Sequence, residues 1–405
     1  MEPILSNAQD NSVAVDLPTL TSLRFFAAAM IFVYHMREFQ PSVFAYAIAP
    51  GMNHGVSFFF VLCGFVLTYA YDGREVAWGR FYLARAARIV PLHIAALVLL
   101  FAAMPLPVAR GQNTDLTISL ISFTLKATLL DSWVPVRAFQ SSWNSVSWSL
   151  SVEMAFYAAF PFLLRVMIRR PLATLAVAAA VPIGVFAAGT AAGVPVFTPE
   201  REALTLYRLV SFFPPSRAFE FALGMATCLA WRRWIAPMRL SFADWTAIEA
   251  TALAGSTAWL IFAVPPLVDG ASGLAFVWLA PSGSCLVFAA LLAAVAKGRG
   301  GLGRLLSLRP MVALGEVSFA FYLVHGTVMR ALRYNFGAGP GALSAFALSL
   351  ALAFLLHEAV GKPMRARVLA WGSSEAGARQ SKPHPSQGGA ARADLAGGPG
   401  RNAAL

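Results

Sequence analysis

Apolar stretches long enough to cross a lipid bilayer recur along almost the whole chain. A helix needs about 20 mostly apolar residues to span the hydrocarbon core of a membrane. Such stretches lie at residues 20–37, 54–71, 89–109, 147–168, 172–192, 216–234, 244–264, 274–296, 312–333 and 341–360. This recurrence predicts an all-α polytopic membrane protein with about ten transmembrane helices.

The composition excludes an ordinary soluble protein. Of the 405 residues, 58% are hydrophobic and 12% are charged, whereas soluble domains are about 45–50% apolar and about 25% charged. The polar side chains are too few to cover a water-soluble body of this size. Cys63, Cys228 and Cys285 each lie in an apolar run without metal-ligand spacing, so we expect neither a disulfide framework nor a metal site.

Residues 116–130 form a further apolar stretch, which Lys126 interrupts. We expect an interfacial or re-entrant helix here and leave it out of the count of spans. If this stretch crossed the membrane, every later loop would change sides.

The distribution of positive charge predicts the orientation in the membrane. Cytoplasmic loops of membrane proteins carry an excess of Lys and Arg. If the N-terminus starts in the cytoplasm, 21 of the 31 Lys and Arg residues fall on that side, the C-terminal tail included, and 8 fall on the other. We therefore expect both termini in the cytoplasm, and we interpret the net charge of +12 as a topology signal rather than as affinity for nucleic acid.

Ionisable side chains at membrane depth are costly, and each is a candidate for function. Four stand out: Arg24 and His35 in the first span, Glu153 in the fourth and His325 in the ninth. Arg24 and His35 are 11 residues apart, which places both on one helix face, about 16 Å apart along the axis. Structural alternatives stay open for all four. They are a snorkelling anchor for Arg24, an interfacial position at a helix end for His35, a structural ion pair for Glu153 and a packing role for His325.

These residues define two expected polar layers. In the outer layer, His35 beside Glu153 is a general-base arrangement, in which the carboxylate orients the imidazole that removes a proton from a hydroxyl. In the inner layer, Arg85 and Arg88 lie three residues apart in the loop before the third span and accompany Arg24. Guanidinium groups bind phosphate bidentately, so this layer suits a phosphate-bearing donor. Positive-inside anchoring is the structural alternative for the pair.

Six segments carry a family resemblance. They are LTSLRFFAAAMIFVYH (20–35), GVSFFFVLCGFVLTY (55–69), RFYLARAARIVPLH (80–93), WSLSVEMAFYAAFP (148–161), FEFALGM (219–225) and GEVSFAFYLVH (315–325). Taken together and in this order, they resemble the acyltransferase-3 family of integral membrane acyltransferases. The family's usual serine in the second segment is Cys63 here, which makes Cys63 a candidate acyl-carrying nucleophile.

The resemblance implies transfer of an acyl group, usually acetyl, from cytoplasmic acyl-coenzyme A to a hydroxyl of an extracytoplasmic carbohydrate or glycoconjugate. The enzyme would lie in the inner membrane of a bacterium and use no metal. His35 would be the catalytic histidine and Glu153 the conserved acidic residue. The donor-binding residues would be Arg24, Arg85 and Arg88, and candidate contacts to the acceptor or to the oxyanion are Trp148, Tyr322 and His325.

The resemblance also sets the expected domain boundaries. Residues 1–19 would be a cytoplasmic N-terminal segment, and residues 20–363 the acyltransferase membrane domain. Residues 364–405 are rich in Gly, Ala, Ser and Pro, and we expect a disordered cytoplasmic tail there.

Two functions from other classes remain as alternatives. A transporter or flippase for a lipid-linked sugar would also have about ten spans and buried ionisable residues. Such proteins often contain inverted repeats, and residues 20–192 and 216–360 show no convincing repeat. A structural subunit of a polysaccharide synthase would not need His35 and Glu153 at matched depth.

Overall fold

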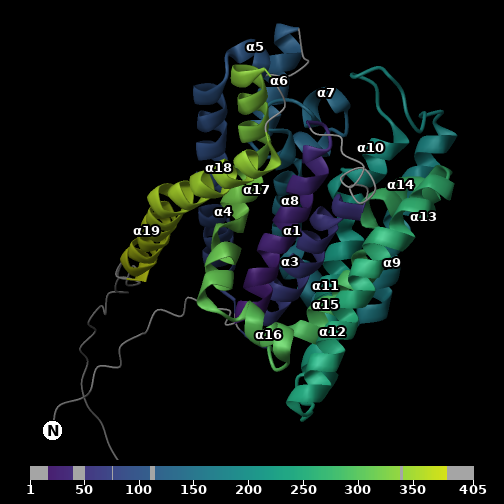
Figure 1. Cartoon of the computed structure of the whole chain (residues 1–405), viewed down its shortest axis with the longest axis vertical. Helices are drawn as coiled ribbons and strands as arrows, with labels where there is room; N and C mark the ends of the chain where they lie inside the picture. The colour runs from purple at the N-terminus through teal and green to yellow at the C-terminus, as the bar shows by residue number, and fades with distance from the viewer. Residues whose placement is uncertain (1–16, 40–50, 75, 110–114, 338–340, 381–405) are drawn as a thin grey trace, which may run out of the picture.

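Helices make up most of the part of the chain that the structure describes, and their arrangement is shown in Figure 1. The computed structural model describes residues 17–39, 51–74, 76–109, 115–337 and 341–380. Within these ranges there is no β-strand, and the one isolated bridge joins Val136 to Leu204. The predicted all-α class is therefore confirmed for the described residues.

Each of the ten predicted spans contains a helix. The longer elements are α1 (Pro18–Met36), α3 (Gly55–Tyr71), α4 (Trp78–Ala103), α8 (Trp148–Arg169), α9 (Pro171–Ala191), α11 (Ala218–Ala230), α12 (Phe242–Ala258), α14 (Gly273–Ser282), α15 (Cys285–Val295), α17 (Arg309–Phe336), α18 (Ala342–Leu356) and α19 (Lys362–Gln380). Short helices connect them: α5 (Leu106–Ala109), α6 (Leu116–Ala127), α7 (Arg137–Gln140), α10 (Leu206–Ser211), α13 (Val264–Gly270) and α16 (Gly301–Leu306).

Among the described residues, 8 helices are long and apolar enough to cross a membrane. The other two predicted spans correspond to α3, which has 17 residues, and to α11, which continues as a π-helix from Trp231 to Ile235. The interrupted stretch at 116–130 forms α6, whose 12 residues extend about 18 Å at 1.5 Å per residue. That length is short of the roughly 30 Å hydrocarbon core, so leaving α6 out of the count agrees with the structure.

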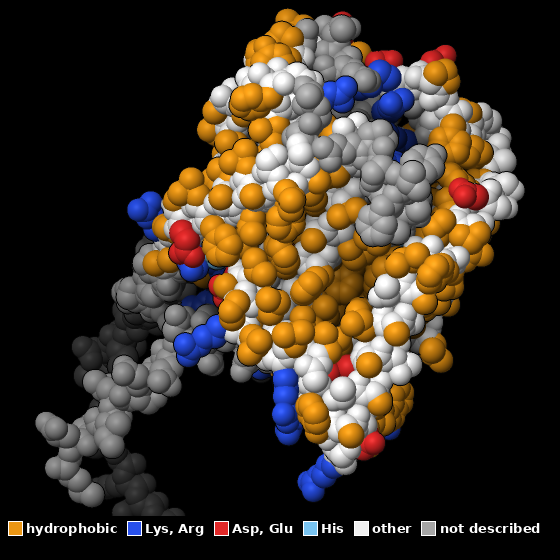
Figure 2. All heavy atoms as spheres, viewed as in Figure 1, with side chains coloured by type: hydrophobic (Ala, Val, Ile, Leu, Met, Phe, Trp, Pro, Cys, Tyr) orange, Lys and Arg blue, Asp and Glu red, His pale blue; other side chains and the backbone are white. Residues whose placement is uncertain are grey.

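The outer surface of the bundle is apolar (Figure 2). Leu172, Phe262 and Leu343 are 80%, 76% and 85% exposed. In the face shown in Figure 2, hydrophobic side chains cover the middle of the bundle, whereas most Lys and Arg side chains lie towards its ends. Large apolar side chains facing outwards in such numbers match a surface solvated by lipid rather than by water.

The sequence predicted that the third span begins at residue 89. In the structure, the helix of this span, α4, begins at Trp78. Arg85 and Arg88 therefore lie within a helix and not in a loop. The reason is that RFYLARAAR (80–88) consists mostly of good helix formers, whereas a hydropathy criterion stops at its arginines. Being helical fixes Arg85 and Arg88 three residues apart on one side of α4.

Residues 364–380, where a disordered tail was expected, are helical in the structure. Helix α18 passes through a π-helical turn, His357–Gly361, into α19, which ends at Gln380 and packs against α4. The Gly, Ala, Ser and Pro that indicated disorder are concentrated after residue 372, while 362–371 (KPMRARVLAW) is compatible with a helix. Residues 381–405, and residues 1–16 of the expected N-terminal segment, lie outside the described residues.

Close helix packing at the centre depends on glycine. A Cβ atom at Gly224 of α11 would lie 1.9 Å from the Val61 carbonyl oxygen of α3, and one at Gly64 would lie 2.0 Å from the Phe221 carbonyl oxygen. Without side chains at these two positions, the backbones of α3 and α11 meet directly, which is a common mode of helix association in membranes. Gly315 of α17 approaches α1 in the same way. A Cβ atom at Gly315 would lie 2.1 Å from the Thr21 carbonyl oxygen.

We expect Gly224→Ala to destabilise the protein, because α3 and α11 must separate to admit the methyl group. The cost should be about 1–3 kcal/mol, as for other overpacked cores, and a lower thermal unfolding midpoint in detergent would show it. Gly184→Ala in α9 is the matched control, since nothing lies within 4 Å of the added Cβ. Equal midpoints for the two variants would contradict the packing argument.

Candidate active site

A pocket inside the bundle brings the predicted donor residues together. Arg24 comes from α1, Arg85 and Arg88 from α4, and Glu153 from α8, and all four line the same pocket. Its other polar lining residues are Cys63, Ser149, Tyr157, Ser318 and Tyr322. Residues far apart in the sequence thus meet at one place. The sequence had predicted this for the three arginines, which it placed together in the inner polar layer.

The pocket carries more positive than negative charge. Its three guanidinium groups face the single carboxylate of Glu153. None of the salt bridges among the described residues involves Arg24, Arg85 or Arg88. The buried Nε of Arg85 has no hydrogen-bond partner among the described residues. Unpaired charge at membrane depth is costly, so the pocket suits an anionic ligand.

The structure places Glu153 with the arginines, and the predicted pairing of Glu153 with His35 is wrong. The Glu153 carboxylate accepts a hydrogen bond from the Tyr157 hydroxyl, and its Oε1 lies 3.9 Å from the Cys63 sulfur. His35 does not line this pocket. Depth along a helix was the only basis for that pairing, and depth does not say towards which neighbour a side chain points.

His35 is instead hydrogen bonded to His325, with 2.9 Å between His35 Nδ1 and His325 Nε2. The other ring nitrogen of His325, Nδ1, is 2.7 Å from the Tyr322 carbonyl oxygen. A carbonyl only accepts, so His325 Nδ1 carries hydrogen and, in the neutral ring, His325 Nε2 is the acceptor. His35 Nδ1 must then donate to it. This assignment, inferred from the hydrogen-bond geometry, leaves the lone pair of His35 on Nε2, where a general base needs it.

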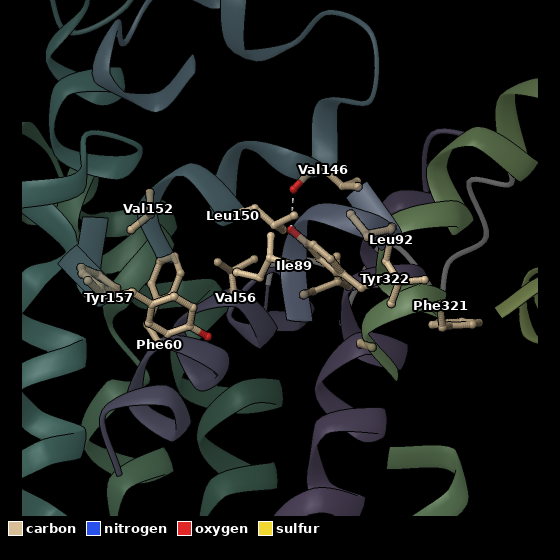
Figure 3. Packing of buried hydrophobic residues seen from close by; sticks show 14 of the residues in the cluster. Val56, Phe60, Ile89, Leu92, Val146, Leu150, Val152, Tyr157, Phe321 and Tyr322 are labelled. Atoms are coloured by element: carbon tan, nitrogen blue, oxygen red, sulfur yellow. Dashed lines mark hydrogen bonds between the residues drawn. The ribbon is translucent and has the colours of Figure 1, made fainter. Parts of the chain in front are cut away.

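Tyr322 connects the pocket to the histidine pair. It lines the pocket, and its ring centroid is 5.8 Å from that of His325. Its hydroxyl donates to the Val146 carbonyl at 2.7 Å, the contact drawn in Figure 3, and lies 2.8 Å from Ser149 Oγ. The hydroxyl proton of Tyr322 is thus already donated to the Val146 carbonyl. It is not free to donate to an oxyanion in this arrangement, which does not favour the expected oxyanion contact.

Trp148 packs beside the pocket rather than lining it. Its ring lies 4.5 Å, centroid to centroid, from Phe212, and the Arg217 guanidinium carbon is 5.9 Å from the Trp148 ring. Arg217 forms a buried ion pair with Glu220, to which Ser282 also donates at 2.8 Å. The sequence analysis did not predict this ion pair. The signal was available, because Arg217 and Glu220 lie three residues apart inside an apolar span.

A second buried ion pair holds the segment that precedes α8. The Lys126 ammonium lies 2.5 Å from the Asp131 carboxylate, and both side chains are 0% exposed. From the same segment, Asn144 donates to the Leu323 carbonyl at 3.0 Å, next to Tyr322 on α17. The sequence had presented Lys126 only as an interruption, and the acid five residues later was the missed signal. This segment therefore helps to place the histidine-bearing part of α17.

Within the described residues, no group of three or more His, Cys, Asp and Glu side chains is arranged to hold a metal ion. The charged groups of the site, three arginines and a carboxylate, line the pocket, and the two hydrogen-bonded imidazoles lie beyond Tyr322. The charged groups can bind an anion, and the imidazoles can remove a proton from a hydroxyl.

We expect Asp131→Asn to destabilise the protein by about 3–5 kcal/mol, because it leaves the Lys126 ammonium buried without a counter-charge. Unfolding midpoints in detergent would measure the loss. Asp269→Asn is the control, since Asp269 is exposed at the end of α13. The double variant Lys126→Met/Asp131→Leu should regain much of the stability. A double variant as unstable as Asp131→Asn would contradict a charge-burial origin.

Comparison with known proteins gives an independent result. Residues 17–358 match the profile of a protein family described as "Acyltransferase domain". The chain is 31% identical over 389 residues to acyltransferase MdmB of Streptomyces mycarofaciens, an alignment that covers 86% of this chain and 92% of that protein.

A second similar protein is named "Putative peptidoglycan O-acetyltransferase YrhL", from Bacillus subtilis (strain 168). It is 25% identical over 337 residues, which cover 77% of this chain and 48% of that protein, so the chain spans about half the length of this relative. No solved structure matches the chain.

Proposed function

Since the chain belongs to the acyltransferase-3 family of membrane proteins, we propose that it transfers an acyl group, in the first place acetyl, from cytoplasmic acyl-coenzyme A to a hydroxyl of an extracytoplasmic carbohydrate or glycoconjugate. Membership of this family makes the chain an acyltransferase and sets aside the transporter and structural-subunit alternatives. The donor, the acceptor class and the side of the membrane are the parts that we propose.

The surplus of positive charge in the pocket carries the donor assignment. Arg24, Arg85 and Arg88 lie together with only Glu153 as a negative partner. Coenzyme A bears a diphosphate and a ribose phosphate, and guanidinium groups bind phosphate oxygens through paired, charge-assisted hydrogen bonds. Its long pantetheine arm separates these phosphates from the thioester. Arg24 and His35 are likewise separated by about three helical turns of α1, so phosphates held by the arginines leave the thioester free to reach the histidine pair.

The proposed transfer is a direct displacement. His35 Nε2 removes the proton of the acceptor hydroxyl as its oxygen forms a bond to the thioester carbonyl carbon. The carbon–sulfur bond then breaks, and the thiolate of coenzyme A takes the proton from the His35 imidazolium. The products are the O-acyl ester and free coenzyme A. In this scheme His325 is a positioning residue, which holds His35 in the tautomer that presents Nε2.

The acceptor class and the location are argued from one relative and from the distribution of charge. One similar protein is named as a peptidoglycan O-acetyltransferase, which favours a carbohydrate hydroxyl. The clusters of Lys and Arg favour cytoplasmic termini in a bacterial inner membrane. This orientation puts the arginine end of the pocket nearer the cytoplasm, where acyl-coenzyme A is made, and the histidine pair nearer the outer face.

We expect His35→Ala to reduce acetyl transfer at least about 100-fold, the low end of what a general base contributes. The assay follows radiolabel from acetyl-coenzyme A into glycan in inverted membrane vesicles, whose cytoplasmic face is outside. His357→Ala at the junction of α18 and α19 is the control and should retain wild-type transfer. Full transfer by His35→Ala would remove His35 from the chemistry, and equal labelling by sealed right-side-out vesicles would contradict the orientation.

Variants of His325 test its positioning role. In His325→Leu nothing accepts the His35 Nδ1 proton, so kcat should fall by roughly tenfold or more, the scale of one hydrogen bond to a catalytic group. In His325→Gln the side-chain oxygen can accept that proton, and kcat should fall less. The KM for acetyl-coenzyme A should stay unchanged in both. Equal losses in the two variants, or a raised KM, would argue for a packing or binding role.

A further inference from the structure

Helix α19 lies along the arginine-bearing start of α4. The two helices pack against each other, and a Cβ at Gly361 would lie 3.3 Å from the Leu92 side chain. From this contact, Arg365 lies one turn further along α19, and Arg88 lies one turn earlier along α4. Two helices that pass in opposite directions bring such positions face to face. Arg365 is in fact close enough to Arg85 and Arg88 to interact with both electrostatically.

Arg365 has no counter-charge among the described residues. Lys362, one turn earlier, is paired with Glu358 at 2.6 Å, and no salt bridge in the described part of the chain involves Arg365. A fourth guanidinium thus lies near Arg85 and Arg88, although Arg365 itself is not among the residues that line the pocket. Like charges held together repel one another, so the arrangement gains stability only when an anion binds among them.

The four arginines differ in how far they are exposed to solvent. Arg365 is exposed, whereas Arg24, Arg85 and Arg88 are partly buried and line the pocket. A donor whose thioester points towards His35 would place its diphosphate among the buried arginines. The phosphate on the ribose, at the far end of the molecule, would then lie outermost, where Arg365 is.

We propose that Arg365 of α19 binds the ribose 3′-phosphate of the acyl-coenzyme A donor at the cytoplasmic mouth of the pocket. This inference rests on the proposed donor. It makes α19 part of the donor site and Arg365 a determinant of specificity, because a donor without the 3′-phosphate would lose this contact. The competing occupant of the same cation is the phosphate of a lipid headgroup.

The experiment compares binding of coenzyme A and 3′-dephospho-coenzyme A to purified full-length protein in detergent by isothermal titration calorimetry. Wild type should bind dephospho-coenzyme A about tenfold more weakly, as expected for one charged hydrogen-bonded contact. Arg365→Gln should weaken coenzyme A binding about tenfold and leave dephospho-coenzyme A binding unchanged. Arg365→Lys should recover part of the loss.

Arg367→Gln is the matched control, since Arg367 is also exposed but lies two residues on, towards another side of α19. It should bind both ligands like wild type. Unchanged coenzyme A affinity in Arg365→Gln overturns the inference, and this is the result expected if Arg365 serves a lipid headgroup. Equal weakening of both ligands also overturns it, because the contact would not depend on the 3′-phosphate.

Failure of the proposed donor gives a different result. If wild type binds neither form of coenzyme A, the donor assignment falls and the role of Arg365 falls with it. If wild type binds both forms equally well and still transfers acetyl, the donor assignment stands and only the inference about Arg365 is overturned.

Discussion

Positive charge that the protein does not neutralise lies at the centre of this bundle, and the surrounding helices are arranged around it. Arg24, Arg85 and Arg88 share a pocket inside the bundle with one carboxylate, and charge buried in a membrane protein is costly. The helices that carry or enclose them must therefore bury one polar face and present apolar side chains to lipid. The exposed leucines and phenylalanines of the outer surface and the arginines of the interior are two results of this one requirement.

Such an interior needs a rigid frame, because unpaired charges tend to separate or to draw in water. The glycine contact between α3 and α11 brings two backbones together and holds Cys63 and Phe60 against the pocket region. The buried Lys126–Asp131 pair fixes the segment that leads to Asn144, whose side chain donates to the Leu323 carbonyl of α17. Backbone packing and internally neutralised charge thus stabilise the walls of a site whose own charge stays unneutralised.

The sequence predicted the class of the fold well, because apolar length is a local property. It also predicted that Arg24, Arg85 and Arg88 belong together. It failed for Glu153, which was assigned to His35 from depth alone, since the direction of a side chain depends on which helices become neighbours. It failed for α19 because composition was averaged over residues with different preferences. The His35–His325 bond joins residues 290 apart in the chain, and no spacing rule could have revealed it.

The hydrogen bonds of the histidine pair also determine where a proton can travel. His35 can pass a proton to His325, but the chain of donors ends at the Tyr322 carbonyl, which cannot accept one covalently. A proton taken up at His35 Nε2 must leave by the same nitrogen. The histidine pair therefore offers no further proton acceptor beyond His325 in this direction.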